Sequence, residues 1–436
     1  MQANVLWKKY FKKDYIEEHY TNKIKNSTSV GMDRITAKKF RENLDENINI
    51  IRKKVNNRTY TFTRYRQLLV SKGKNKNPRC ICIPTIRDKL VLSILNEILF
   101  GVYGQKGQTQ MPQVIISEIV NELRNYKYFI KLDIKTFYAS IDHEILMKKL
   151  NQRIHKKEIR NLIEKSIKTP EIAIPIKTKN IYDTRSVGIP EGLSISNFLA
   201  NIYMIPIDEK YSCKDDILYF RYVDDILLLA NKENFQQITK ELVSDLTRMK
   251  LCVNDKKDEG RISKGFEYLG YMINEKCITV RLSSIYKIEN SFEELIKEYK
   301  RKKLKNLKYL EWKINLKVTG FIMEKNKYGW MFFYSQITDI SLLYRLDNTL
   351  NKILKRYGIS HIHVKRFVRV YHEITKALHK SKYIINTDNL SDKDKSAIME
   401  DIYDIEIKPE IDIDEKFRKL MMREVKDIEK DIQCIS

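Results

Sequence analysis

The chain has 436 residues, of which 42% are hydrophobic, and this composition allows a large core divided among two or three subdomains. Its formal net charge of +25 points to a polyanionic partner, and the partner that this charge favours is nucleic acid. No apolar stretch approaches the roughly 18 residues that a membrane-spanning helix needs, and no signal peptide is recognisable. We therefore predict a cytoplasmic protein with no membrane partner.

The cysteines do not indicate a zinc site. There are six of them, and only Cys80 and Cys82 are close in sequence, with a Cys-x-Cys spacing that lacks the paired arrangement of zinc ligands. The seven histidines do not complete such a site. We expect reduced thiols, as is typical of a cytoplasmic protein.

Two predicted elements end in carboxylates. A strand is predicted at 128–132, and Asp133 stands at its end, before a turn and a helix from about 144 to 150. Further along, the apolar runs 217–220 and 226–230 flank Tyr-Val-Asp-Asp at 222–225, a pattern typical of a β-hairpin.

The carboxylates of these two elements suggest a metal site. Asp224 and Asp225 repel one another and resist burial, so a hairpin that displays both favours a bound cation. Oxygen ligands suit Mg²⁺, and Asp133 would complete a frame for two divalent ions. The alternative is a solvated turn, for which the Asp215-Asp216 pair upstream is an ordinary example.

The same segments resemble a known family. Lys-Leu-Asp-Ile-Lys-Thr-Phe-Tyr at 131–138 and Tyr-Val-Asp-Asp at 222–225 resemble motifs A and C of reverse transcriptases. Other segments resemble the family's remaining motifs in the same order: 31–33 the amino-terminal motif of bacterial members, 71–89 the fingers, 188–203 motif B, 251–257 motif D and 266–271 motif E. So many matches in one order argue against chance.

The resemblance implies a set of catalytic and metal-binding residues. Asp133, Asp224 and Asp225 would bind two Mg²⁺ ions with help from the backbone carbonyl of Ile134, and Mn²⁺ would be able to substitute. Lys257 of motif D would protonate the departing pyrophosphate. The primer would be gripped by the motif E residues Tyr268, Leu269 and Gly270.

The resemblance also implies a nucleotide site. Lys72 and Arg79 of the fingers would clamp the phosphates, although plain surface charge is the alternative. Tyr138 would lie under the sugar and exclude a 2′-hydroxyl, although core packing is the alternative and Phe137 is also aromatic. The motif B residues that would approach the nucleotide are Pro190, Glu191 and Gly192.

Motif B departs from the family pattern. The usual Pro-Gln-Gly is here Pro190-Glu191-Gly192, and the usual Ser-Pro-x-Ser-Pro is replaced at 193–197. Glu191 would add negative charge near a triphosphate, so it must be paired, turned away or functional. These departures separate the chain from mobile-element enzymes and argue against processive general copying.

The predicted fold is an α+β right-hand polymerase with an antiparallel palm sheet. We expect an N-terminal region and fingers at 1–125, a palm with motifs A to E at 126–278, a helical thumb at 279–385 and an acidic tail at 386–436. Basic residues recur with helical spacing over 297–317, where they would either track a nucleic-acid backbone or form a solvated face. The tail is expected to be a solvated surface or a partner contact.

The predicted function is RNA-directed DNA synthesis, which makes cDNA from dNTPs by two-metal nucleotidyl transfer. The chain most resembles the defence-associated or abortive-infection reverse transcriptases, which implies a structured noncoding RNA template and a role in antiphage defence. An accessory defence protein or a homo-oligomer would be a further partner. The alternatives are a retron enzyme, an RNA-dependent RNA polymerase and a catalytically idle RNA-binding scaffold.

Overall fold

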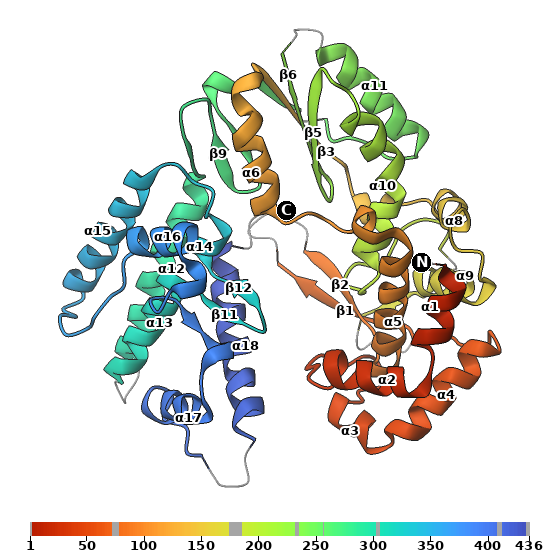
Figure 1. Ribbon diagram of the computed structural model, residues 1–436, viewed down its shortest axis with the longest axis horizontal. Helices are drawn as coiled ribbons and strands as arrows, with labels where there is room; N and C mark the ends of the chain where they lie inside the picture. The colour runs from red at the N-terminus through yellow and green to blue at the C-terminus, as the bar shows by residue number, and fades with distance from the viewer. Residues whose placement is uncertain are drawn as a thin grey trace. The chain divides into compact units, whose positions relative to one another are not determined.

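The computed structural model describes residues 2–71, 78–173, 185–231, 235–255, 257–301, 306–407 and 412–432. The chain forms two compact units, each made of two segments (Figure 1). The first unit contains residues 1–110 and 128–259, and the second contains residues 111–127 and 260–436.

A four-stranded sheet forms the centre of the first unit. Its strand order is β5-β6-β3-β7, and β6 is antiparallel to both of its neighbours. The bounds are β3 (Tyr128–Asp133), β5 (Ile217–Tyr222), β6 (Asp225–Ala230) and β7 (Asp258–Arg261). The predicted α+β class with an antiparallel central sheet is therefore confirmed.

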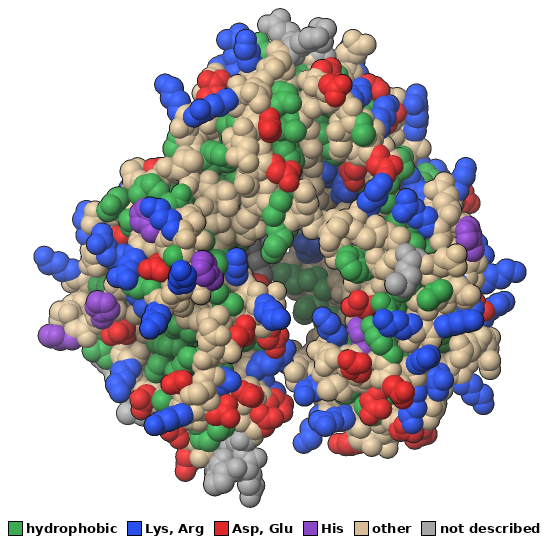
Figure 2. All heavy atoms as spheres, viewed as in Figure 1, with side chains coloured by type: hydrophobic (Ala, Val, Ile, Leu, Met, Phe, Trp, Pro, Cys, Tyr) green, Lys and Arg blue, Asp and Glu red, His purple; other side chains and the backbone are tan. Residues whose placement is uncertain are grey.

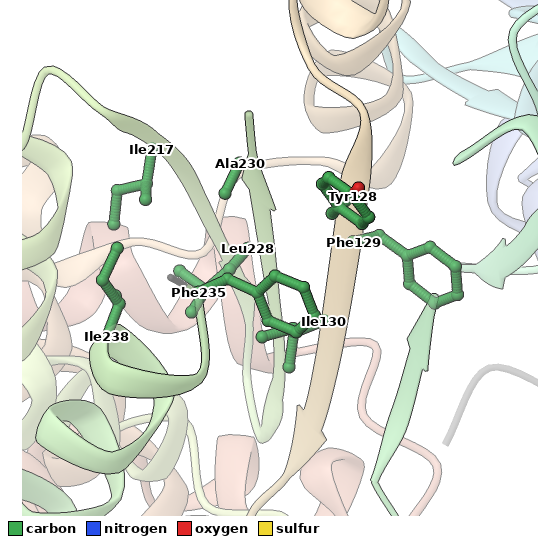
Figure 3. A pocket seen from close by; sticks show the side chains of 8 residues that line it. All are labelled: Tyr128, Phe129, Ile130, Ile217, Leu228, Ala230, Phe235 and Ile238. Carbon is green, nitrogen blue, oxygen red and sulfur yellow. The ribbon is translucent and has the colours of Figure 1, made fainter. Parts of the chain in front are cut away.

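Two helices pack against this sheet. In α10 (Ser196–Ser212) most of the apolar side chains are buried, and the helix packs beside β5. In α11 (Phe235–Arg248) the first residues meet apolar side chains from β3, β5 and β6 (Figure 3). The rings of Tyr128 and Phe235 lie 5.5 Å apart there. Apolar side chains of these helices thus cover the strands. The polar residues lie beyond this packing, at the ends of the strands.

A second sheet and a helical layer complete the first unit. Strand β1 (Tyr65–Val70) pairs antiparallel with β2 (Arg79–Ile83) and parallel with β4 (Glu171–Ile172). Helix α5 (Ile86–Tyr103) begins where the buried Asp88 accepts hydrogen bonds from Thr85 and Tyr60 at 2.8 and 2.7 Å. The other α-helices are α1 (Ala3–Tyr10), α2 (Lys13–His19), α3 (Ala37–Glu42), α4 (Leu44–Asn56), α7 (Phe137–Ser140), α8 (His143–Asn151) and α9 (Lys157–Lys168).

The second unit begins with a small antiparallel sheet. Its strands are β8 (Phe266–Tyr268), β9 (Tyr271–Ile273) and β10 (Ile278–Val280), and β9 and β10 bond to the segment at 333–338. The Tyr271 hydroxyl donates to the Phe333 carbonyl at 2.5 Å, and the Ile278 amide donates to the Thr338 hydroxyl at 2.9 Å. Strands assigned to the palm from the sequence therefore share a compact unit with the helices that follow, and the predicted subdomain boundaries do not coincide with the division between units.

Helices dominate the rest of the second unit. Beside α6 (Pro112–Glu122), they are α12 (Leu282–Arg301), α13 (Leu307–Thr319), α14 (Trp330–Phe333), α15 (Ile340–Arg356), α16 (Phe367–Lys376), α17 (Asp392–Asp401) and α18 (Ile413–Ile432). The short strands β11 (Phe321–Met323), β12 (Asn326–Tyr328) and β13 (Ile385–Asn386) form a sheet in the order β12-β11-β13.

Helix α18 is held to α13 by two buried ion pairs. The Lys313 ammonium lies 2.5 Å from Glu424, and both side chains are less than 10% exposed. Lys317 lies 2.5 Å from Asp431. Burial alone would lower the pKa of Lys313, but the carboxylate of Glu424 raises it above its ordinary value. Lys313 is therefore charged beside the acid of α18.

This arrangement corrects two expectations. The predicted basic helix over 297–317 is divided between α12 and α13, and Lys313 and Lys317 face a buried partner helix instead of a nucleic-acid backbone. The acidic segment after residue 386 is not only a solvated surface, because Phe417, Met421 and Val425 belong to a core cluster of the second unit.

The surface carries mixed charge. Figure 2 shows Lys and Arg side chains spread over the visible face and interspersed with Asp and Glu. No helix within the described ranges combines the length and the apolar character required to cross a membrane.

Removing one partner of a buried pair tests the role of α18. Glu424→Gln removes the nearer of the two carboxylates that pair with the buried Lys313 ammonium and leaves Asp427 at 3.2 Å, so we expect the free energy of unfolding to fall by about 1–3 kcal/mol. The control is Glu415→Gln on the same helix, whose ion pair with Lys419 is exposed, and it should change the free energy by less than about 0.5 kcal/mol. Denaturant unfolding that gives equal changes for both variants would contradict the assignment.

Candidate active site

The hairpin at 217–230 brings two carboxylates to one end of the central sheet. Tyr222 pairs with Asp225 as the last register pair of β5 and β6, so Val223 and Asp224 form a two-residue turn. Val223 adopts a left-handed backbone conformation with φ of 58°. A β-branched residue adopts this conformation only where its surroundings enforce it.

Arg221 supplies that enforcement. Its guanidinium donates to the Val223 carbonyl at 2.9 Å and to the two carboxylate oxygens of Asp208 at 2.8 and 2.6 Å. A further bond of 3.2 Å reaches Asn201. The Arg221 side chain is only 7% exposed. Arg221, the basic residue nearest to the two aspartates in sequence, thus joins the turn to α10.

Asp133 lies opposite Asp225 in the register of β3 and β6. Directly opposed residues of antiparallel strands have their Cα atoms about 4.5–5.5 Å apart. The Ile134 amide donates to the Asp224 carbonyl at 3.0 Å, which ties the two carboxylate-bearing segments together just beyond the paired strands. The three aspartates are half-buried at one end of the sheet, as the sequence predicted.

Asn254 holds the Asp133 carboxylate and was not identified from the sequence. Its side-chain amide donates to Asp133 Oδ2, and its backbone amide donates to the Asp133 carbonyl at 2.8 Å. The adjacent bridge between Ile134 and Val253 aligns the two segments. The signal available in the sequence was a polar residue inside motif D, but its partner 121 residues away was not visible.

These residues offer oxygen ligands of the kind that divalent cations prefer. Within the ranges that the structure describes, no three Asp, Glu, His or Cys side chains are gathered into a group that could hold a metal ion. The carboxylates of Asp133 and Asp225 nevertheless belong to opposed residues, with Asp224 next in the turn. The donor chemistry fits Mg²⁺, and Asn254 fixes one of the donors.

The motif B turn lies against strand β2. The Cys82 amide donates to the Glu191 carbonyl at 2.7 Å, and Ser196 donates to the Pro190 carbonyl at 2.6 Å. Gly192 has φ of 95°, and a Cβ there would lie 2.5 Å from Ile81 Cγ2. The turn therefore requires glycine at this position.

Glu191, the departure from the family pattern, is paired with Arg79. The Arg79 Nε donates to Glu191 Oε2 at 2.5 Å. The structure thus joins the predicted phosphate-binding arginine to the unexpected acid, and this answers the question that the sequence left open about Glu191.

Tyr138 lies near enough to this pair and to the hairpin for their charges to act on it. Burial raises its pKa to about 12, and the charges that act on it include those of Arg79, Glu191 and Asp224. The phenol is therefore neutral at physiological pH. Its hydroxyl donates to Asn197 Oδ1 at 3.4 Å. The neighbouring Phe137 is only 3% exposed and belongs to the core.

The remaining predicted residues are placed as follows. Lys72 lies outside the described residues. Lys257 is exposed, in the segment that leads into β7. Tyr268, Leu269 and Gly270 belong to the second unit, where Leu269 and Gly270 form the turn between β8 and β9.

The family comparison matches the part of the chain that carries this site. Residues 70–273 match the model of the family described as "Reverse transcriptase (RNA-dependent DNA polymerase)". Residues 70–273 are therefore similar to a reverse-transcriptase domain. The match extends from the end of β1 to the end of β9, and it includes both the β2 strand of Arg79 and the three aspartates. The predicted right-hand polymerase fold is confirmed by this match.

Relatives of the reverse-transcriptase domain are encoded in introns. Over 159 residues the chain is 30% identical to the "Uncharacterized 91 kDa protein in cob intron" of Schizosaccharomyces pombe, which covers 34% of this chain and 19% of that protein. Over 260 residues it is 26% identical to the "Group II intron-encoded protein LtrA" of Lactococcus lactis subsp. cremoris, which covers 57% of this chain and 40% of that protein. The matched region thus spans less than half the length of each relative.

The comparison with solved structures gives a telomerase. The structure of telomerase from Candida albicans in complex with a TWJ fragment of telomeric RNA has a TM-score of 0.45 and 13% sequence identity. The match covers 92% of this chain and 68% of that chain.

Asn254→Ala tests how the Asp133 carboxylate is held. The substitution removes the side-chain donor but keeps the backbone bond to the Asp133 carbonyl, so the fold should persist. We expect nucleotide incorporation to fall about 10-fold, with a higher Mg²⁺ concentration needed for half-maximal activity. The control is Asn125→Ala, which removes an exposed amide bonded to Glu122. Unchanged Mg²⁺ dependence in Asn254→Ala would contradict this role.

Proposed function

We propose that the chain is an RNA-directed DNA polymerase that extends a primer 3′-hydroxyl with dNTPs to make cDNA. The observation that carries the proposal is the register of β3, β6 and β5, which gathers Asp133, Asp225 and Asp224 inside a reverse-transcriptase domain. In the reaction the 3′-oxygen forms a bond to the α-phosphorus of the nucleotide, and the bond to the leaving pyrophosphate breaks.

The three aspartates and the Ile134 carbonyl would hold two Mg²⁺ ions, or Mn²⁺ in their place. When bound, such ions lower the pKa of a primer hydroxyl and neutralise charge on the leaving pyrophosphate. The chain's own residues do the positioning: Asn254 orients the Asp133 carboxylate, and Arg221 fixes the turn that carries Asp224.

The nucleotide would lie between the hairpin, Tyr138 and Arg79. Arg79 would contact the phosphates together with Lys72, while Lys257 would donate a proton to the pyrophosphate. The turn at Pro190, Glu191 and Gly192 would approach the base pair with its backbone. In the second unit, the turn at Tyr268, Leu269 and Gly270 would contact the primer.

The proposed template is a structured noncoding RNA, and the proposed setting is antiphage defence. Support comes from the net charge of +25 and from the departure in motif B, which disfavours general copying. RNA recognised by shape and backbone suits a basic protein. An intron RNA is the alternative template, because the relatives named above are encoded in introns.

Asp224→Asn provides the central test. It removes a carboxylate charge while keeping the shape and easing repulsion with Asp225, so synthesis should stop while folding and RNA binding persist. Asp216→Asn, at the exposed Asp-Asp pair upstream, is the matched control and should remain active. Extension of a primer on RNA is measured with dNTPs and with ribonucleotides separately.

Each outcome of that assay separates the alternatives. Extension with ribonucleotides alone would favour an RNA polymerase, and no extension by the unaltered protein with Mg²⁺ or Mn²⁺ would favour a scaffold. RNA bound to Asp224→Asn is then sequenced, and random cellular RNA would contradict a dedicated template. Phage protection that survives in Asp224→Asn would contradict a defence role for synthesis.

Tyr138→Ala tests the sugar gate. Enlarging the sugar pocket should raise the ratio of ribonucleotide to deoxynucleotide kcat/KM, because a 2′-hydroxyl would then fit. The control is Phe137→Ala, which should lower stability by about 3–5 kcal/mol without changing that ratio. An unchanged ratio in Tyr138→Ala would assign the ring to packing instead.

A further inference from the structure

The Arg79–Glu191 ion pair joins the fingers to the motif B turn at the nucleotide site. Its N–O distance is 2.5 Å, and the two side chains are 38% and 30% exposed. An ion pair this accessible to solvent is weak, because water and salt compete with it. A more highly charged anion at the same place would therefore be able to displace the carboxylate.

The backbone keeps Glu191 close to Arg79. The Cys82 amide donates to the Glu191 carbonyl at 2.7 Å, so Glu191 is attached to β2 three residues beyond Arg79. Gly192 packs against Ile81 so closely that even a Cβ would collide. The backbone of Glu191 is thus fixed against β2, and its carboxylate stays within reach of the guanidinium.

A second arginine nearby is already paired with another acid. Arg185 lies 2.6 Å from Glu171, whose other carboxylate oxygen accepts a hydrogen bond from Cys82 at 3.2 Å. The two acids are thus matched to two arginines on this side of the β1–β2–β4 sheet. This leaves Arg79 as the partner of Glu191.

We propose that Glu191 competes with the nucleotide triphosphate for Arg79. This inference rests on the proposed function and adds to it a determinant of nucleotide affinity. Without nucleotide the pair is closed. When a triphosphate binds, the guanidinium turns from the single carboxylate charge to the phosphate oxygens, which are stronger partners for it. Glu191 then raises the nucleotide concentration at which the enzyme works.

The experiment compares Glu191→Gln with the unaltered protein. The amide keeps the shape and an acceptor oxygen but removes the charge, so the KM for dATP should fall about two- to fivefold, the effect of a single exposed ion pair, while kcat stays constant. Inorganic tripolyphosphate, which has no base or sugar, should inhibit more strongly by the same factor. Glu171→Gln is the matched control and should leave the KM for dATP and the inhibition constant of tripolyphosphate unchanged.

Arg79→Ala distinguishes competition from simple repulsion. It should raise the KM for dATP, and adding Glu191→Gln to it should then have no further effect. A Glu191→Gln effect that persists without Arg79, or a KM that rises in Glu191→Gln alone, would overturn the proposal. Glu191→Ala should also lower the KM for dATP, and it replaces Glu191→Gln in the experiment if that variant does not fold.

Binding measured without turnover separates this inference from the proposed function. Calorimetric titration with dATP in Ca²⁺ should show tighter binding to Glu191→Gln. If synthesis fails in every assay while this tightening is seen, the proposed function fails and the inference stands. If dATP does not bind, or binds both proteins equally, the inference is overturned.

Discussion

The register between β3, β6 and β5 is the constraint on which the site depends. Strand β6 is apolar and buried along 226–230. A shift of its register by one residue would still bury apolar side chains, whereas in an alternating strand it would bury polar ones. The register must be fixed at the turn. Arg221 does this, because its bonds to Val223 and Asp208 join the turn to α10. A basic residue bonded to the backbone of the turn thus determines where the aspartates lie.

Three basic side chains form ion pairs inside the molecule. Arg221 is bound to Asp208, Lys313 to Glu424 and Lys317 to Asp431, and all three basic side chains are at most 10% exposed. Each pair is neutral, so the net charge of +25 is carried by the other residues. Long-range attraction depends on the net value, whereas specific backbone contacts depend on the exposed residues.

The local patterns made the site predictable, and the long-range partners did not. Hairpin geometry is a short-range property, so the turn that carries Asp224 and Asp225 followed from the sequence, whereas its pairing with Asp133 was expected from the family resemblance. The bonds of Asn254 to Asp133 and of Lys313 to Glu424 join residues more than 100 positions apart. No period in a single sequence encodes such a pairing. For Glu191, the departure from the family pattern was recognisable in the sequence, but its pairing with Arg79 was not.

The attachment of α18 to α13 also affects how the protein is made. Lys317 and its counter-ion Asp431 are separated by 114 residues, and Lys313 and Glu424 by 111. During synthesis α13 therefore emerges well before the acids that neutralise it, and its lysines must stay hydrated until α18 follows. The first unit is complete once residue 259 has been made. The unit that contains Asp133, Asp224 and Asp225 is thus able to fold before the last helix of the other unit has been made.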